Sequence, residues 1–85
     1  MLHVLVIYDI SDDKDRHKVS DACLNYGLDR YQYSVFAGRL KPIHLRELAK
    51  VLKPHAETGQ ITVMTIASDD WTRRVQLGVA DDKHN

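Results

Sequence analysis

The sequence contains a single cysteine, Cys23, and lacks the short motifs that carry much of known enzyme chemistry. One cysteine excludes an intrachain disulfide and indicates a reducing compartment. No glycine-rich phosphate loop, CxxC pair or HExxH sequence is present, so the usual signatures of nucleotide and zinc sites are missing. No apolar run approaches the length of a membrane span, and no basic signal-peptide segment opens the chain. We therefore expect a cytoplasmic protein without a membrane partner.

The chain also lacks an excess of charge of either sign, since 12 basic and 12 acidic residues cancel over 85 positions. Net charge therefore gives no support to nucleic-acid binding, and any basic surface must come from an uneven distribution. A chain of this length forms one domain with a modest core, so association between copies would add stability. We expect a single domain over residues 1–80 and a disordered tail at 81–85.

Hydrophobic periodicity predicts alternating strands and helices. Strands are expected at 2–9, 60–67 and 71–79, with helices at 13–26 and 42–55 and a turn at 68–70. The apolar composition of 60–67 is typical of a strand covered on both faces. Residues 28–40 fit either one bent strand or a tight hairpin, with Gly38 the candidate for a bulge or a bend at the end. This order predicts an α+β sandwich of the βαββαβ type, whose extra C-terminal strand adds to a partner's sheet in a twofold homodimer.

The first predicted strand ends in a carboxylate, Asp9, on the same face as Leu5 and Ile7. A carboxylate in such a position is costly unless it is paired, hydrogen-bonded or bound to a metal. Either the strand simply ends in a polar turn, or Asp9 binds a metal while Arg16 and Lys18 of the next helix contact phosphates. Mg²⁺ needs only one or two carboxylates, and two copies of Asp9 across a dimer axis would make the better site. Mg²⁺ or Mn²⁺ there could polarise a phosphodiester and activate water.

Other candidate residues have simpler interpretations. Tyr31, Tyr33 and Phe36 could stack on RNA bases, but their segment lacks the glycine of the RNA-binding strand motif, and core packing is favoured. Cys23 falls on the apolar stripe of the first helix and is interpreted as a core residue. The five histidines have no spacing that makes a local metal site.

Three segments carry specific motifs: YDISDDKDRHKV at Tyr8–Val19, YGLDRYQYSVFAGRL at Tyr26–Leu40 and RRVQLG at Arg73–Gly78. Together they resemble the small CRISPR-associated endonuclease family, the second of the two adaptation proteins. The resemblance implies a ferredoxin-like domain that forms a homodimer, with a divalent-metal site where Asp9 meets its mate across the twofold. It also implies nuclease activity on RNA or double-stranded DNA, and a place as the central scaffold of the CRISPR integrase, which inserts new spacers.

The resemblance, read position by position, assigns roles to particular residues. Asp9 is the expected catalytic and metal-binding residue. Arg16, Lys18 and Arg30 are the expected nucleic-acid contacts. Tyr8, Ser34 and Phe36 are the expected supporting residues. The chain departs from the family pattern at Ala37, where many members have glutamate, and at Asp15 and His17, where members often have arginine.

Two functions therefore stay open. The first is a metal-dependent endonuclease of the Mg²⁺ or Mn²⁺ type that acts in spacer acquisition. The second is a non-catalytic dimeric scaffold that bridges the integrase and holds duplex DNA. A third and weaker hypothesis is a ferredoxin-like regulatory or RNA-binding module.

Overall fold

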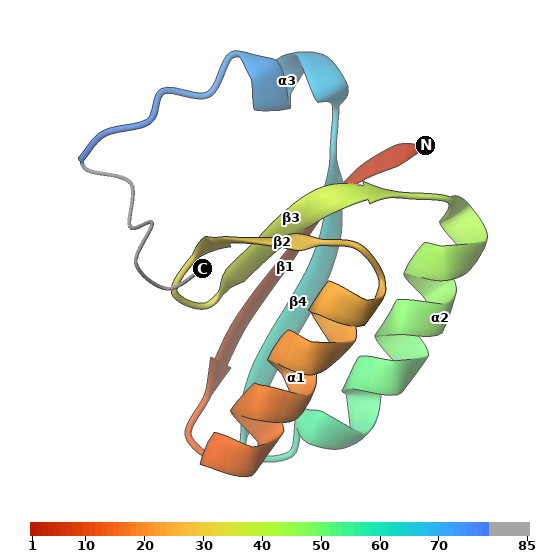
Figure 1. Cartoon of the computed structure of the whole chain (residues 1–85), viewed down its shortest axis with the longest axis vertical. Coiled ribbons are helices and arrows are strands. Elements are labelled where there is room, and N and C mark those ends of the chain that lie inside the picture. The colour runs from red at the N-terminus through yellow and green to blue at the C-terminus, as the bar shows by residue number, and fades with distance from the viewer. Residues whose placement is uncertain (79–85) are drawn as a thin grey trace.

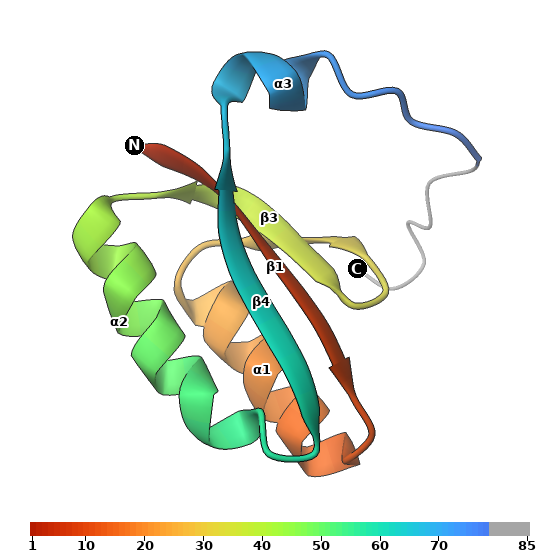
Figure 2. The ribbon, with the colours of Figure 1, turned by 180° about the vertical axis from the view of Figure 1, so that it is seen from behind.

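The computed structural model describes residues 1–78 and shows two long helices packed on one face of a four-stranded sheet (Figure 1). The elements are β1 (Leu2–Ile10), α1 (Asp13–Asn25), β2 (Asp29–Gln32), β3 (Val35–Leu40), α2 (Pro42–Leu52), the short 3₁₀ helix η1 (Lys53–His55), β4 (Gly59–Ile66) and α3 (Ser68–Thr72). The strand order is β2-β3-β1-β4, and every pairing is antiparallel. Figure 2 shows the opposite face of the sheet, which neither α1 nor α2 covers. The predicted combination of helices with an antiparallel sheet is confirmed.

The hydrophobic core lies between the sheet and the two long helices. Alternate residues of β1 point into it: Val4, Val6, Tyr8 and Ile10 are buried. They meet Val19 and Cys23 of α1, Phe36 and Leu40 of β3, and Leu48 and Leu52 of α2. The period-two pattern of β1 thus decides which face of the sheet receives the helices.

Local signals in the sequence set the ends of α1. The Asp12 side chain caps the helix by accepting a hydrogen bond of 2.9 Å from the backbone N–H of Asp15. Gly27 follows the helix with a φ of 87°, a conformation that glycine adopts without strain. The helix predicted at 13–26 is confirmed to within one residue.

The second predicted helix divides into two parts. It begins as expected at Pro42, but the α-helical part ends at Leu52 and continues only as the 3₁₀ turn η1. Pro54 lies in that turn and has no N–H to extend the α-helical ladder.

Cys23 is fully buried, as expected of a core residue. Burial raises the pKa of its thiol to about 12, the largest effect, against a smaller opposite effect of Arg30. The thiol is therefore protonated and unreactive at neutral pH.

Residues 28–40 form a hairpin and not one bent strand. β2 and β3 pair directly, with Tyr33 and Ser34 in the turn between them. The pairing skips Tyr31, because Arg30 opposes Phe36 and Gln32 opposes Val35. The bulge is therefore at Tyr31, and the expectation of a bulge at Gly38 was wrong.

The burial predicted for the fourth strand was also wrong. β4 runs from Gly59 to Ile66, close to the predicted range, but none of its residues is fully buried. Two facts explain this: β4 is an edge strand that pairs only with β1, and neither α1 nor α2 covers the second face of the sheet. A run of β-branched residues such as Ile61, Thr62 and Val63 reads alike in central and edge strands.

The predicted turn at 68–70 was wrong, and the predicted strand at 71–79 does not form within the described residues of a single chain. Ser68–Thr72 forms α3, and residues 73–78 form no strand. Asp69 and Asp70 fall in the first turn of α3, where carboxylates favour a helix. Position 79 and the expected tail at 81–85 lie outside the described residues.

None of the helices in residues 1–78 has the length and apolar content needed to cross a membrane.

The indole of Trp71 anchors α3 on the sheet face that α1 and α2 leave open. Its ring centroid lies 4.5 Å from that of His3 on β1 and 5.0 Å from that of Tyr31 on β2. His3 Nε2 is buried without a hydrogen-bond partner among the described residues. Burial, and then the positive charges of Arg39 and Arg74, lower the pKa of His3 below its ordinary value.

This pKa shift predicts a pH dependence for the anchoring of α3. Because the folded state disfavours the charged imidazole, the stabilisation is complete above the ordinary pKa of 6.5 and is lost as the pH falls through the lowered value. Trp71 fluorescence should therefore change when the pH is lowered from above 6.5 through the lowered pKa of His3. The variant His3→Gln should lose this transition, and an equal transition in the variant and the native protein would contradict the assignment.

Candidate functional site

Asp9 lies exposed near the end of β1, on the sheet face that the long helices leave open. It is paired in register with Gln60 of β4. Residues 1–78 contain no group of three or more His, Cys, Asp or Glu side chains that could hold a metal ion. A single chain therefore presents one carboxylate at this position and not a complete set of metal ligands.

A close backbone approach fixes the position of Asp9. A Cβ atom added to Gly59 would lie 1.9 Å from the carbonyl oxygen of Asp9 and 2.8 Å from Cα of Ile10. Only glycine allows β4 to run this close to the end of β1. The glycine that begins β4 thus allows this strand to pass close to the backbone of the candidate catalytic residue.

A second feature lies on the other side of the sheet, between α1 and the β2–β3 turn. This is a cavity of about 140 Å³, called here the arginine pocket, lined by Tyr8, Arg16, His17, Ser20, Arg30, Tyr33 and Ser34. It brings together four of the predicted site residues, namely Tyr8, Arg16, Arg30 and Ser34. Asp9 is not among its residues, because neighbours on a strand point to opposite faces.

Sequence reasoning missed Ser20 and Tyr33 as part of this pocket. Ser20 lies one helical turn after Arg16 and so shares its face of α1. This spacing could have predicted that Ser20 lies beside Arg16. Tyr33 is brought in by the hairpin turn, for which no local turn signal exists in the sequence. His17, which stands at a departure from the family pattern, also lines the pocket.

Both arginines of the pocket are engaged by the protein itself. Arg16 Nη1 donates to the carbonyl oxygens of Ile10 at 3.1 Å and Ser11 at 3.2 Å, and Nη2 donates to the Asp13 carboxylate. Arg16 thereby holds the turn that follows Asp9 against α1.

Arg30 fastens the hairpin to α1 in the same way. Its Nη2 donates to Ser20 Oγ at 3.0 Å, and its Nη1 donates to the carbonyl oxygen of Tyr33. Burial raises the pKa of the Tyr8 hydroxyl, and the nearby Arg30 opposes this with a smaller lowering effect. The phenol of Tyr8 is therefore neutral near pH 7 and is available as a hydrogen-bond donor.

The remaining predicted residues lie elsewhere. Phe36 is completely buried in the core, and the Arg30 guanidinium lies 4.8 Å from its ring centroid, so its support is structural. Lys18 is exposed on α1 and does not line the arginine pocket. The Asp15 carboxylate lies 3.0 Å from Nδ1 of His55, and this hydrogen bond joins α1 to η1.

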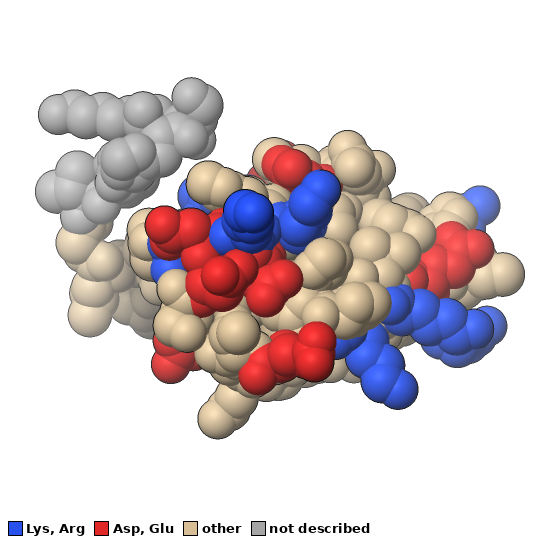
Figure 3. Space-filling model, turned by 90° about the horizontal axis from the view of Figure 1, so that it is seen from below, with Lys and Arg blue, Asp and Glu red and all other residues tan. Residues whose placement is uncertain are grey.

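The charge around the start of α1 is mixed. Asp12, Asp13 and Asp15 alternate there with Lys14 and Arg16. Figure 3 views the molecule from below and shows acidic side chains gathered towards the centre and left with a few basic ones among them, and a separate group of basic side chains towards the right. The start of α1 therefore has no excess of positive charge, in keeping with the zero net charge of the chain.

With this geometry established, the chain can be compared with known proteins. Residues 1–74 match the model of the family described as CRISPR associated protein Cas2. The chain belongs to the Cas2 family. The family resemblance is thereby confirmed, and the match covers the first two sequence motifs, the sheet, both long helices and α3.

Individual Cas2 proteins are similar over most of the chain. A CRISPR-associated endoribonuclease Cas2 of Chloroflexus aurantiacus is 43% identical over 77 residues, which cover 86% of this chain and 88% of the relative. The crystal structure of Streptococcus pyogenes Cas2 matches with a TM-score of 0.75 and 29% identity over 91% of this chain and 100% of that chain. A chain of a partial Cas6-RT-Cas1–Cas2 complex matches with a TM-score of 0.72 and 29% identity over 91% of each chain.

The close approach at Gly59 yields a prediction. The variant Gly59→Ala should lower the free energy of unfolding by roughly 1–3 kcal/mol, as overpacking does, because the new methyl group must displace the Asp9 backbone. Urea denaturation measures this. The matched control Gln60→Ala, at the next and exposed position of β4, should stay within about 0.5 kcal/mol of the native protein. Equal stability of the two variants would show that the contact at Asp9 is not tight.

Proposed function

We propose that this Cas2 protein is a divalent-metal-dependent endonuclease that works as a homodimer in CRISPR spacer acquisition. The observation that carries the proposal is the exposed carboxylate of Asp9 at the end of β1, where Gly59 of β4 passes close to its backbone, on a face that no long helix covers. The substrate is a phosphodiester of RNA or double-stranded DNA. The name of the Chloroflexus aurantiacus relative, an endoribonuclease, supports the nuclease part of the proposal.

The domain of the proposed dimer is of the ferredoxin-like type. Its support is the order of elements, βαββαβ before α3, together with the strand order β2-β3-β1-β4. In that arrangement β1 and β3 lie at the centre of the sheet, and β2 and β4 form the two edges.

The edge formed by β4 supports association with a second copy. An apolar groove of about 340 Å³ runs between this edge and α2, with Leu52, Ile61 and Val63 among its lining residues. Further along the chain, Val75 and Leu77 are 81% and 82% exposed. An open edge and an exposed apolar segment are both unfavourable in a monomer, and pairing this segment of one copy with β4 of the other would remove both. The strand addition predicted from the sequence would then occur only in the dimer.

The proposed metal is Mg²⁺, with Mn²⁺ as the alternative. One carboxylate does not make a site, but Mg²⁺ keeps several waters and needs only one or two carboxylates. The chain therefore fits the metal on the condition that Asp9 and the partner's Asp9 share it. Bound there, the metal would supply polarisation of the phosphodiester and an activated water.

In this proposal, different residues of the chain bind the metal, contact phosphate and support the arginine pocket. Asp9 binds the metal, while Lys18, exposed on α1, contacts phosphate. Arg16 and Arg30 line the arginine pocket and add positive charge there, although several of their N–H groups already bond to the protein. Tyr8 and Ser34 support this pocket from the strand and the hairpin turn.

A second function, a scaffold without required catalysis, is favoured by two observations. Residues 1–78 hold no group of three or more His, Cys, Asp or Glu side chains that could bind a metal ion. A structural match comes from a complex that contains Cas1 and Cas2. In this alternative the dimer bridges subunits of the CRISPR integrase and holds duplex DNA.

The variant Asp9→Asn separates the two functions. Metal polarisation is worth several kcal/mol, so metal-dependent cleavage should fall by at least about a hundredfold while the dimer stays intact by light scattering. The matched control Asp21→Asn, at an exposed position of α1, should cleave as the native protein does. Equal cleavage by Asp9→Asn and the native protein would rule out the nuclease assignment. Unchanged spacer acquisition with Asp9→Asn would identify the scaffold as the required function.

A further inference from the structure

The arginine pocket contains one residue that is almost fully buried. Tyr8 is 6% exposed, whereas the other residues that line this cavity of about 140 Å³ are half-buried or exposed. None of the side-chain hydrogen bonds found within residues 1–78 gives an acceptor to the Tyr8 hydroxyl proton. A buried donor without an acceptor costs free energy. A ligand with negatively charged oxygen atoms would supply this acceptor.

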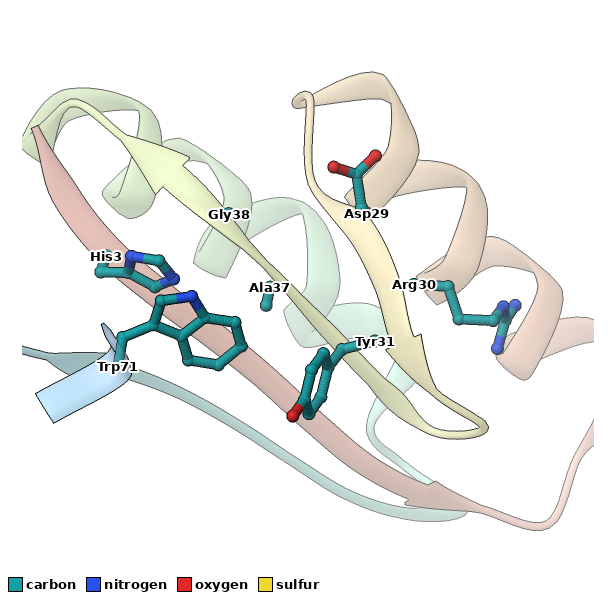
Figure 4. Close-up of a pocket in the computed structure, with 7 residues that line it drawn as sticks. All are labelled: His3, Asp29, Arg30, Tyr31, Ala37, Gly38 and Trp71. Carbon is teal, nitrogen blue, oxygen red and sulfur yellow. The ribbon is translucent and has the colours of Figure 1, made fainter. Parts of the chain in front are cut away.

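Arg30 brings to the pocket a fixed positive charge that no carboxylate neutralises. Its Nη2 donates to Ser20 Oγ at 3.0 Å and its Nη1 to the carbonyl oxygen of Tyr33, while its guanidinium lies 4.8 Å from the Phe36 ring centroid. All three partners are neutral, and none of the ion pairs within residues 1–78 includes Arg30. In Figure 4 its side chain points away from the aromatic rings of the open sheet face and towards α1. The charge is thus held on the helix side of the sheet, where it favours an anion.

The rest of the lining also favours an anion. It contains Arg16, His17 and Ser34, and no Asp or Glu side chain. The backbone N–H of Tyr8 donates to the carbonyl oxygen of Ser34 at 3.1 Å, so the hairpin turn is held beside β1. Arg16 shares its charge with Asp13, which does not line the cavity, and still adds to the positive potential there. Hydroxyl groups and cations from α1, β1 and the turn therefore surround one small space.

The size of the pocket and its set of donors select one kind of anion. Pockets for drug-sized ligands measure roughly 300–1,000 Å³, so this smaller cavity admits a group of a few atoms whose substituent stays outside. A phosphate monoester has three strong acceptor oxygens and a charge of about −1.5 to −2 at pH 7. A phosphodiester has one charge less and carries a substituent on each of two sides, so both would have to leave the same small space. A monoester therefore matches the pocket better than the backbone of a strand does.

We propose that the arginine pocket binds a phosphate monoester, either the terminal phosphate of a nucleic-acid strand or free phosphate. The site lies on the face of the sheet opposite Asp9, and β2 of its hairpin is the edge strand opposite β4. It therefore stays accessible in the proposed dimer, which forms through the open face and the β4 edge. Binding requires neither metal nor cleavage, so the inference goes beyond the proposed function and holds for the nuclease and for the scaffold alike.

Phosphorus NMR tests the proposal with one probe that contains both kinds of phosphate. Full-length native protein in EDTA is titrated into a uridine dinucleotide that carries a phosphate at each end. EDTA removes any catalytic metal, so binding is measured whether or not the nuclease proposal holds. We expect a saturable shift of the monoester resonances and little change of the diester resonance. No shift, or an equal shift of both kinds, would overturn the proposal.

Inorganic phosphate in a separate titration distinguishes the two sources of the ligand. Tighter binding of the dinucleotide would assign the pocket to strand ends, since the nucleoside beside the phosphate would then add contacts. Equal affinities would assign it to free phosphate, because the phosphoryl group alone would account for binding.

Two variants and one matched control locate the site. Tyr8→Phe removes only the buried hydroxyl and should weaken monoester binding roughly 10- to 100-fold, the usual effect of losing a hydrogen bond to a charged group. Ser34→Ala, in the hairpin turn and outside the core, should also weaken it and gives a second test if Tyr8→Phe fails to fold. Tyr26→Phe makes the same change at a tyrosine that packs on the core but does not line the pocket, and should bind as the native protein does. Equal affinities of all three variants would overturn the proposal.

Discussion

The alternation of side chains along β1 is the constraint on which the rest of the structure depends. β1 lies between β3 and β4, so every other element is placed relative to it. One set of its side chains, Val4, Val6, Tyr8 and Ile10, forms the centre of the core under α1 and α2. The other set puts His3 and Asp9 on the open face. A shift by one residue would exchange the two sets, burying Asp9 and exposing the core.

The open face is incomplete in a single chain. Ile7 and Met64 are 40% and 42% exposed on strands β1 and β4, and β4 has no neighbour beyond it. Asp9 stands on this face as a single carboxylate. A second copy would cover apolar surface and would bring a second carboxylate. The same association would therefore protect the open face and complete the metal ligands. The arginines on the other side hold the turn after Asp9 and the hairpin in place, which ties the local fold to the proposed site.

Most of the fold could be predicted because its signals are local. The alternation of β1, the cap at Asp12 and the glycine at Gly27 each act within a few residues. Some residues of the arginine pocket, Arg16 and Arg30 among them, were predicted through the family motifs. The fate of the C-terminal segment depends instead on a tertiary contact, since Trp71 packs on His3 and holds α3. Sequence periodicity registers Val75 and Leu77 as a strand pattern but carries no information about that contact.

The metal stoichiometry tests the central claim most directly, namely that a site exists only where two copies of Asp9 meet. Mn²⁺ is titrated into the native protein, and the bound ion is counted by electron paramagnetic resonance, with Asp9→Asn protein as the reference. We expect one Mn²⁺ for every two chains, and none at this site in Asp9→Asn. One Mn²⁺ per chain, or binding that survives in Asp9→Asn, would contradict it.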